Sequence, residues 1–308
     1  PREALLHLPS TLTRLILPPG EHLTDESIKS LPRGLLHLDM NYQSEITADM
    51  VDDLPKNLES LWMSLVGLED DSLKRLPRTL KRLSILSIEQ SKTRHLPPCL
   101  ESLKVFRATL RTRWNNSKFP STLKSFNCAM TDEFETICLP RELLELDASA
   151  ESFVDDSALD LPKALVSLNL RTCSAALTNA FFAKLPCVVL TSLGCHSAEG
   201  RQVTDECIRY LPCTLTALSL NLPLITGECS GFLPPNLRSL QLHQSSAWHN
   251  ADLARLPRTL RVLHLPRCTG FTKECLALLP PNLLTFENGS SLEFKNIPQH
   301  RTPEATLW

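Results

Sequence analysis

Residues 211–220 read Leu-Pro-Cys-Thr-Leu-Thr-Ala-Leu-Ser-Leu, a stretch in which a Leu-Pro pair is followed by three regularly spaced leucines. The pattern L-P-x-x-L-x-x-L-x-L, with small variations, recurs thirteen times along the 308-residue chain, at steps of 20 to 26 residues. A period of this size is typical of a solenoid, in which each repeat packs against its neighbours. The repeats start at Leu8, Leu31, Leu54, Leu76, Leu96, Phe119, Leu139, Leu161, Leu185, Leu211, Leu233, Leu256 and Leu279.

Each repeat has two parts with different periodicity. The closing L-x-L, as in residues 218–220, alternates apolar and variable positions and predicts a short strand. Before the Leu-Pro pair, Val203-Thr204-Asp205 is followed by an apolar Ile208, a spacing that suits a short helix or 3-10 segment. Thr and Asp are good N-cap residues, and the proline then ends the segment. We expect strand, loop, helical segment and Leu-Pro turn in every repeat.

These repeats predict an α/β solenoid: a right-handed horseshoe of about thirteen repeats. Its strands form a concave parallel sheet spaced by about 4.8 Å, and its short helical or 3-10 segments lie on the convex side. We expect residues 1–290 to form this repeat domain and residues 291–308 to be a C-terminal cap or a disordered tail. The chain opens Pro-Arg-Glu without an initiator Met, which we interpret as a fragment or processed chain.

Over residues 3–290 the recurring L-x-x-L-x-L resembles the leucine-rich repeat superfamily. The Leu-Pro-x-x-Leu segment looks like the short repeats of bacterial secreted effectors. The segment Val203-Thr204-Asp205-Glu206-Cys207-Ile208 looks more like the cysteine-containing repeats of eukaryotic F-box proteins, and is also similar to FNIP-type repeats without their Phe-Asn signature. The resemblance implies a horseshoe fold and a role in protein–protein interaction.

The chain departs from the family in the loop after each strand. Many leucine-rich repeats carry an asparagine three residues after the last strand leucine, where it caps loop backbone. Here that column holds Cys173, Pro223 and Ser245 among others, and no asparagine. Other groups must therefore satisfy the loop backbone. The least regular repeats lie over Phe106–Asn127 and Leu185–His196, the second with an extra residue in Val188-Val189-Leu190.

Composition limits the classes of partner. The formal net charge is −2, which gives no electrostatic indication of nucleic-acid binding. No apolar run reaches the roughly 18 residues of a membrane helix. The eleven cysteines are scattered through the repeats, which fits free and mostly buried thiols in a reducing compartment, cytoplasmic or nuclear. Cys187 and Cys213 share one repeat position, and Cys207, Cys229 and Cys275 share another, so a stacked pair could also bond.

In a strand x-L-x-L-x the leucines point inward, so the variable positions form the concave face. Three large apolar side chains there are Trp62, Leu86 and Phe106, of a kind enriched among binding hot spots, although they could also pack against neighbouring strands and bind nothing. Polar positions farther along suit hydrogen bonding to a protein or peptide, or form a solvated face. The predicted partner-binding residues are Trp62, Leu86, Lys104, Phe106, Asn127, Asp147, Asn169, Arg171, Asn221, Gln241, His243 and His264.

No pattern indicates catalysis, a cofactor or a metal. His243 and His264 fall on neighbouring strands with His196 farther away, so we expect only two of them to converge, with no carboxylate to complete a metal site. The acidic doublets at residues 52–53, 70–71 and 155–156 are interpreted as caps near helical N-termini. The chain has no G-x-S-x-G, H-E-x-x-H or Walker loop.

The favoured hypothesis is a non-enzymatic scaffold that binds a protein or peptide on its concave face, in an oligomeric state that the sequence does not indicate. One alternative is the substrate-recognition part of a ubiquitin ligase of F-box or effector type whose other domain is absent. Another is a regulator of a GTPase, although the short repeats and the lack of a matching loop argue against it. A purely structural spacer predicts that no concave substitution affects any interaction.

Overall fold

A computed structural model describes residues 5–18, 24–41, 47–63, 70–88, 90–106, 118–129, 139–149, 153–172, 176–197, 201–245, 247–289 and 294–295. The chain divides into two compact units, Pro1–Ala150 and Glu151–Trp308. In each unit a strand follows every Leu-Pro turn, as the repeat pattern predicts.

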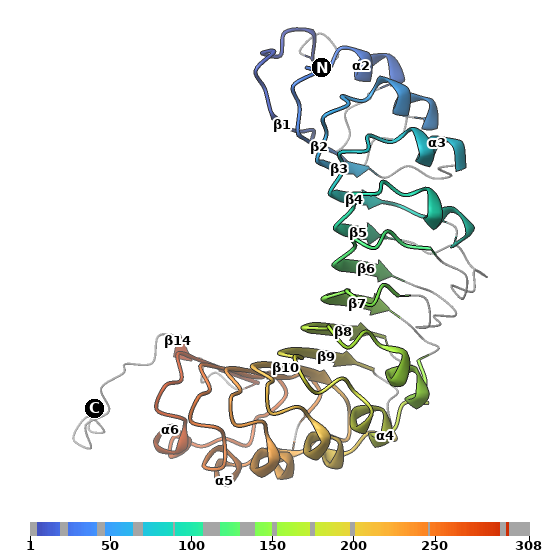
Figure 1. The fold of residues 1–308 in the computed structure, drawn as a ribbon. Helices are drawn as coiled ribbons and strands as arrows, with labels where there is room; N and C mark the ends of the chain where they lie inside the picture. Colours follow the sequence, from blue (N-terminus) through green and yellow to red (C-terminus); the bar gives the residue numbers. More distant parts are fainter. Residues whose placement is uncertain are drawn as a thin grey trace. The chain divides into compact units, whose positions relative to one another are not determined.

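The N-terminal unit contains parallel strands that pair in chain order, each with the next (Figure 1). Matching positions of successive repeats lie side by side; Leu38, for example, is level with Leu61, and Leu61 with Leu83. Equivalent positions of successive repeats are therefore paired in the sheet. The strands are β1 (Arg14–Ile16), β2 (His37–Met40), β3 (Ser60–Met63), β4 (Arg82–Ile85), β5 (Ser102–Val105), β6 (Ser125–Ala129) and β7 (Glu145–Ser149).

The C-terminal unit repeats this arrangement and ends differently. Its first six strands are parallel, whereas β14 pairs antiparallel with β13 through Phe286 and Phe294. Part of the segment expected to be a cap or tail thus extends the sheet, and residues 296–308 lie outside the described part. The strands are β8 (Ser167–Arg171), β9 (Ser192–His196), β10 (Ala217–Asn221), β11 (Ser239–Leu242), β12 (Val262–Leu265), β13 (Thr285–Asn288) and β14 (Phe294–Lys295).

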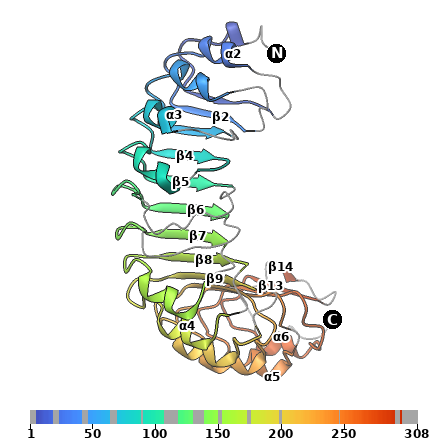
Figure 2. The ribbon, with the colours of Figure 1, turned by 90° about the vertical axis from the view of Figure 1, so that its right-hand side faces the viewer.

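Short helices line one side of each unit, away from the strands (Figures 1 and 2). Several begin after a Thr N-cap, as predicted: Thr47, Thr178 and Thr226 each accept a hydrogen bond from the backbone N–H two residues on. The α-helices are α2 (Asp25–Lys29), α3 (Asp70–Arg75), α4 (Asn179–Ala183), α5 (Asn250–Leu253) and α6 (Cys275–Leu278). The 3-10 helices are η1 (Ala48–Asp53), η2 (Gln90–His95), η5 (Asp155–Asp160), η6 (Asp205–Tyr210) and η7 (Gly227–Phe232).

The core of each repeat lies between its strand and its helical segment. In the repeat that begins at Leu211, the three pattern leucines are 0–1% exposed. Val203 and Ile208, in the segment just before this Leu-Pro turn, are equally buried. Burying a leucine side chain contributes about 1.5–3 kcal/mol, so the regular spacing of these residues supplies the main stabilising term. The predicted inward direction of the strand leucines is confirmed.

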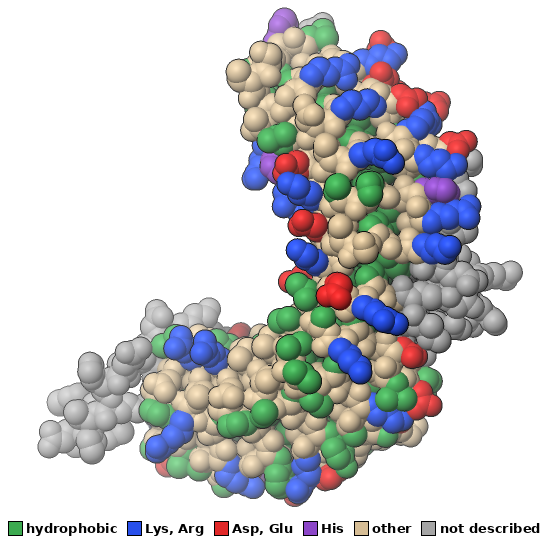
Figure 3. Space-filling model, viewed as in Figure 1, with side chains coloured by type: hydrophobic (Ala, Val, Ile, Leu, Met, Phe, Trp, Pro, Cys, Tyr) green, Lys and Arg blue, Asp and Glu red, His purple; other side chains and the backbone are tan. Residues whose placement is uncertain are grey.

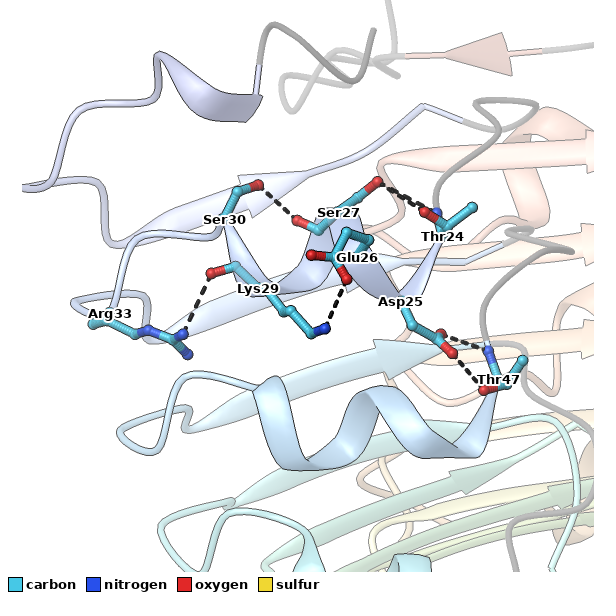
Figure 4. Close-up of polar contacts among 8 residues, drawn as sticks. All are labelled: Thr24, Asp25, Glu26, Ser27, Lys29, Ser30, Arg33 and Thr47. Atoms are coloured by element: carbon cyan, nitrogen blue, oxygen red, sulfur yellow. Dashed lines mark hydrogen bonds and ion pairs between the residues drawn. The ribbon is translucent and has the colours of Figure 1, made fainter.

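A hydrogen-bond ladder on the helical side links successive repeats (Figure 4). The carboxylate of Asp25 accepts from the backbone N–H of Thr47 at 2.8 Å and from its hydroxyl at 2.5 Å. The Thr47 hydroxyl accepts in turn from Asp49 N, so one carboxylate fixes the start of the next helix. We call this arrangement the Thr–Asp ladder. It recurs in the pairs Asp155–Thr178 and Asp205–Thr226, and with asparagine in Asn179–Thr204 and Asn250–Thr272.

The ladder is replaced where neither Asp nor Asn follows the capping residue. Gly227 occupies the position after Thr226 and has no side chain to reach His249 in the next repeat. Asp252 fills the vacant space, because a Cβ built on Gly227 would lie 2.0 Å from its Oδ2. The same Oδ2 accepts from His249 N at 2.8 Å, and Oδ1 pairs with Arg255 at 2.7 Å. A local capping contact thus takes over from the inter-repeat contact.

A second ladder runs through the Leu-Pro turns. The Thr79 hydroxyl donates to Leu58 O at 2.7 Å, and Thr259 donates to Leu237 O at the same distance. Where asparagine stands at this position, its amide donates instead, as from Asn282 to Arg258 O at 3.0 Å. These bonds give turn carbonyls of one repeat a donor from the next repeat. These two ladders hold the connecting segments of a chain whose loops carry no asparagine column.

The structure corrects the interpretation of one acidic doublet. Asp52 and Asp53 lie at the end of η1, not at a helical N-terminus. Asp52 instead forms an ion pair with Arg75 of the next repeat. The other two doublets do open helical segments, at α3 and η5. The extra residue near position 188 forms a turn in which Val188 is 80% exposed, so the insertion leaves the core without displacing the leucines.

None of the described cysteines forms a disulfide, and most of them are buried. Burial raises the pKa of the Cys128 thiol to about 12. We expect iodoacetamide to label exposed Cys187 and Cys213 in the folded protein and to label Cys128 only after unfolding in urea, because only the thiolate reacts. Mass spectrometry of labelled peptides measures this. Labelling of Cys128 at the rate of Cys213 would show that its repeat is not packed as described.

Candidate functional site: the strand surface

The strand surface of each unit is formed by the side chains that alternate with the buried leucines. Its central column follows the sheet register without a break inside each unit. The column runs through Asp39, Trp62, Ser84, Lys104, Asn127 and Asp147 in the N-terminal unit. It runs through Asn169, Gly194, Ser219, Gln241, His264 and Glu287 in the C-terminal unit.

An aromatic cluster with a central cation lies on β3 to β5. The Lys104 ammonium lies 4.8 Å from the Phe106 ring centroid and 6.0 Å from that of Trp62. The Trp62 side chain is 41% exposed, and Leu86 is half-buried at the end of β4. Ser84, between Trp62 and Lys104 in the register, is 1% exposed, and its hydroxyl has no hydrogen-bond partner within the described residues. The structure therefore brings Lys104 to the rings of Trp62 and Phe106, and Leu86 lies at the end of the neighbouring strand; we call these four residues the aromatic–lysine cluster.

Two middle positions of the predicted site form a hydrogen bond with each other. Asn127 Nδ2 donates to Asp147 Oδ2 at 2.9 Å across β6 and β7. Asn169 lies close over Gly194, since a Cβ there would meet Asn169 Oδ1 at 2.3 Å. Arg171 is exposed at the end of β8. These residues are half-buried or exposed, but Asn127 and Asp147 already satisfy part of each other's hydrogen-bonding capacity.

Three histidines form a continuous row on β9 to β12. The ring centroids of His196 and His243 are 5.5 Å apart, and those of His243 and His264 are also 5.5 Å apart. Glu287 lies beyond them, with its Oε2 3.5 Å from His264 Nδ1. The expectation that only two histidines converge, without a carboxylate, is therefore wrong. The side chains lean across Asn221, which separates His196 from His243 in the sheet.

The surroundings of His243 favour its neutral imidazole. Partial burial, and after it the neighbouring His264, lower the pKa of His243. The His196 Nε2 lies 3.2 Å from the Ser219 hydroxyl, a contact in which the tautomer decides which atom donates. Gln241, which the sequence also singled out, lies half-buried beside His264 in the register. Within the described residues, no three His, Cys, Asp or Glu side chains are arranged to hold a metal ion.

Other exposed apolar side chains are dispersed on the C-terminal unit. Figure 3 shows hydrophobic side chains spread over the visible face of this unit, and many basic side chains on the N-terminal unit. Val188 and Val189 belong to the inserted turn. The Phe232 ring is covered by the Arg209 guanidinium at 3.6 Å. These positions do not share a sheet face as the aromatic–lysine cluster does.

Comparison of the structure with solved structures gives matches over most of the chain. An internalin (inlF) from Listeria monocytogenes matches with a TM-score of 0.52 and 16% identity, covering 95% of this chain and 89% of the other. The chain has the leucine-rich repeat fold. TLR13, in a complex with ssRNA13, matches with a TM-score of 0.53 and 20% identity, covering 83% of this chain but 39% of that one.

The likeness to other leucine-rich repeat proteins concerns the fold, since the identities are 16% and 20%. No family model and no curated protein matches the sequence. Among the described residues, no helix is long and apolar enough to cross a membrane. The functional argument therefore depends on the residues of the strand surface itself.

Proposed function

We propose that this leucine-rich repeat chain is a non-enzymatic scaffold that binds a peptide segment of a partner protein on its strand surface. The observation that carries the proposal is the aromatic–lysine cluster. Lys104 lies over two aromatic rings on a regular sheet, and Trp62 keeps 41% of its surface exposed. Exposed tryptophan on a rigid support is the residue type most enriched at binding hot spots.

The chemistry of the cluster indicates the kind of segment that it binds. The rings and Leu86 offer apolar contact, while the Lys104 ammonium offers one positive charge between them. An extended segment with apolar side chains and one carboxylate complements both features. Repeat packing and the two hydrogen-bond ladders already order the sheet. It therefore loses little conformational entropy on binding. A nucleic-acid ligand is not proposed, because the chain carries a net charge of −2.

A peptide-display selection tests this function. Random peptides are selected on the immobilised chain, and the binders are measured by fluorescence anisotropy against wild type and the double variant Trp62→Ala/Phe106→Ala. Each removed hot-spot side chain costs about 2 kcal/mol, so the double variant should weaken binding by at least about a hundredfold.

The matched control is Val188→Ser/Val189→Ser, which removes exposed apolar side chains that lie off the strand surface. It should bind the selected peptides like wild type. If the control loses binding while the double variant keeps it, the partner surface lies elsewhere and the proposal is wrong.

A further inference from the structure

The histidine row of the C-terminal unit groups titratable side chains on one surface. His196, His243 and His264 contact one another through their rings along four neighbouring strands. Imidazoles titrate near pH 6.5, the only side chains whose ordinary pKa lies in this range. The row can therefore change charge under mild acidification while the leucine core stays apolar.

The strand surface of this unit has two columns: the central column, and a second column two residues further along each strand that holds Arg171, His196, Asn221 and His243. Few other charged groups belong to these two columns. Arg171 follows the same column as His196 on β8, and Glu287 faces His264 from β13. The positions on β10 and the remaining positions on β11 are Ser219, Asn221 and Gln241, which do not titrate. Arginines flank the columns outside the strands, before β11 and β12 and after β12: Arg238, Arg261 and Arg267. Lys295 of β14 pairs with Thr285 through the backbone.

Protonation changes the charge of this surface in one direction. With neutral imidazoles, Arg171 and Glu287 leave the two columns without net charge. Protonating the three histidines gives the columns a net charge of +3, flanked by further arginines. In that state Glu287 is the one acidic residue among the described positions of the two columns, and a ligand with several carboxylates would relieve the repulsion among the imidazolium groups.

We propose that the strand surface of the C-terminal unit is an acid-activated binding site for an acidic peptide segment, which it binds when His196, His243 and His264 become protonated. The site goes beyond the proposed function, because it uses none of the residues of the aromatic–lysine cluster. The occupant is a carboxylate-rich segment of a protein, since charge complementarity requires several spaced negative groups along the row.

A buried hydrogen-bond acceptor beside the row also favours protonation of the histidines. Asn221 lies between His196 and His243 in the register, and its Oδ1 is buried without a donor within the described residues. A neutral imidazole has one N–H group, whereas a protonated imidazole has two. Protonation thus adds donors beside an acceptor that lacks one. Burial of His243, which lowers its pKa, places part of the transition below the usual histidine range.

The protonation of His243 affects the stability of the folded chain in one direction. A histidine whose folded-state pKa lies below its unfolded value contributes stability that is complete above about pH 6.5 and is lost as the pH falls toward the folded pKa. A bound carboxylate stabilises the protonated form and opposes this loss. Binding of the acidic segment should therefore take up protons.

The test measures fluorescence anisotropy of a labelled poly-aspartate peptide at low salt, with a poly-asparagine peptide of equal length as the uncharged probe. Three new ion pairs at a surface of this exposure should tighten binding about tenfold between pH 7.5 and pH 5.5. The triple variant His196→Gln/His243→Gln/His264→Gln should lose this gain, because glutamine of similar size cannot be protonated.

Controls separate the row from the charge of the whole chain. His7→Gln/His37→Gln/His95→Gln removes as many titrating groups from the N-terminal unit and should keep the gain. Trp62→Ala/Phe106→Ala should also keep the tighter binding at pH 5.5. If peptide binding at the aromatic–lysine cluster proves wrong, this result can therefore still be interpreted. Equal loss in both histidine triples, or no gain in wild type, overturns the proposal.

A second variant keeps the test valid if the row triple does not fold by circular dichroism. Glu287→Gln removes the acidic group of the row and should tighten poly-aspartate binding about threefold at both pH values. Unchanged binding of this variant would also overturn the proposal.

Discussion

Replacing Leu168 by Asp is expected to abolish cooperative folding of the C-terminal unit. Leu168 is 0% exposed and lies level with Leu193 in the sheet. An unpaired carboxylate at this depth costs more than the total stability of about 5–15 kcal/mol typical of a domain, unless the surrounding repeats open. Because repeats contact mainly their neighbours, the loss should spread from β8 into adjacent repeats. Urea denaturation followed by circular dichroism measures it.

The matched control introduces the same charge one residue away. Asn169 is half-buried on the strand surface, so Asn169→Asp should change the free energy of unfolding by less than about 1 kcal/mol. If Asn169→Asp unfolds the unit and Leu168→Asp does not, the direction assigned to this strand is reversed.

Breaking one contact of the Thr–Asp ladder is also expected to lower the free energy of unfolding substantially. Asp205 accepts from Thr226 N at 2.7 Å and from Thr226 Oγ1 at 2.6 Å, and Thr226 Oγ1 accepts from Glu228 N. Asp205→Ala removes both charged hydrogen bonds and leaves the Thr226 N–H without its partner. We expect a loss of about 2–3 kcal/mol in the free energy of unfolding, measured by urea denaturation.

The chain itself supplies the control for this substitution. Asn179 and Asn250 perform the same role toward Thr204 and Thr272, with Oδ1 accepting from the backbone N–H and Nδ2 donating to the hydroxyl. Asp205→Asn should therefore cost less than half as much as Asp205→Ala. Equal losses for both variants would mean that the contact between repeats is not what Asp205 contributes.

The repeat pattern predicted the strands, the buried leucines and the Thr caps, because these depend on local periodicity and residue type. It did not predict that Asp205 reaches Thr226 in the next repeat, since that contact depends on how far one repeat rises above another. The signal was present nonetheless: Asp or Asn follows the capping Thr or its equivalent in several repeats, and Gly227 interrupts the series where Asp252 compensates.

The repeat pattern also did not predict the contacts within the histidine row. Strands two apart lie about 9.6 Å from each other, so the repeat spacing alone places His196 and His243 apart. Their ring centroids are 5.5 Å apart because both imidazoles lean over the smaller Asn221. Packing on the surface sets side-chain rotamers of this kind, and the spacing of the repeats does not predict them.

The central claim is that the pattern leucines face the core while the residues that alternate with them form the strand surface. Leu61 and Trp62 on β3 test it most directly, with exposures of 0% and 41%. Comparing the free energies of unfolding of Leu61→Ala and Trp62→Ala, we expect a loss of about 2–5 kcal/mol for the smaller residue and less than about 1 kcal/mol for the tryptophan. A loss for Trp62→Ala as large as that for Leu61→Ala would contradict the account.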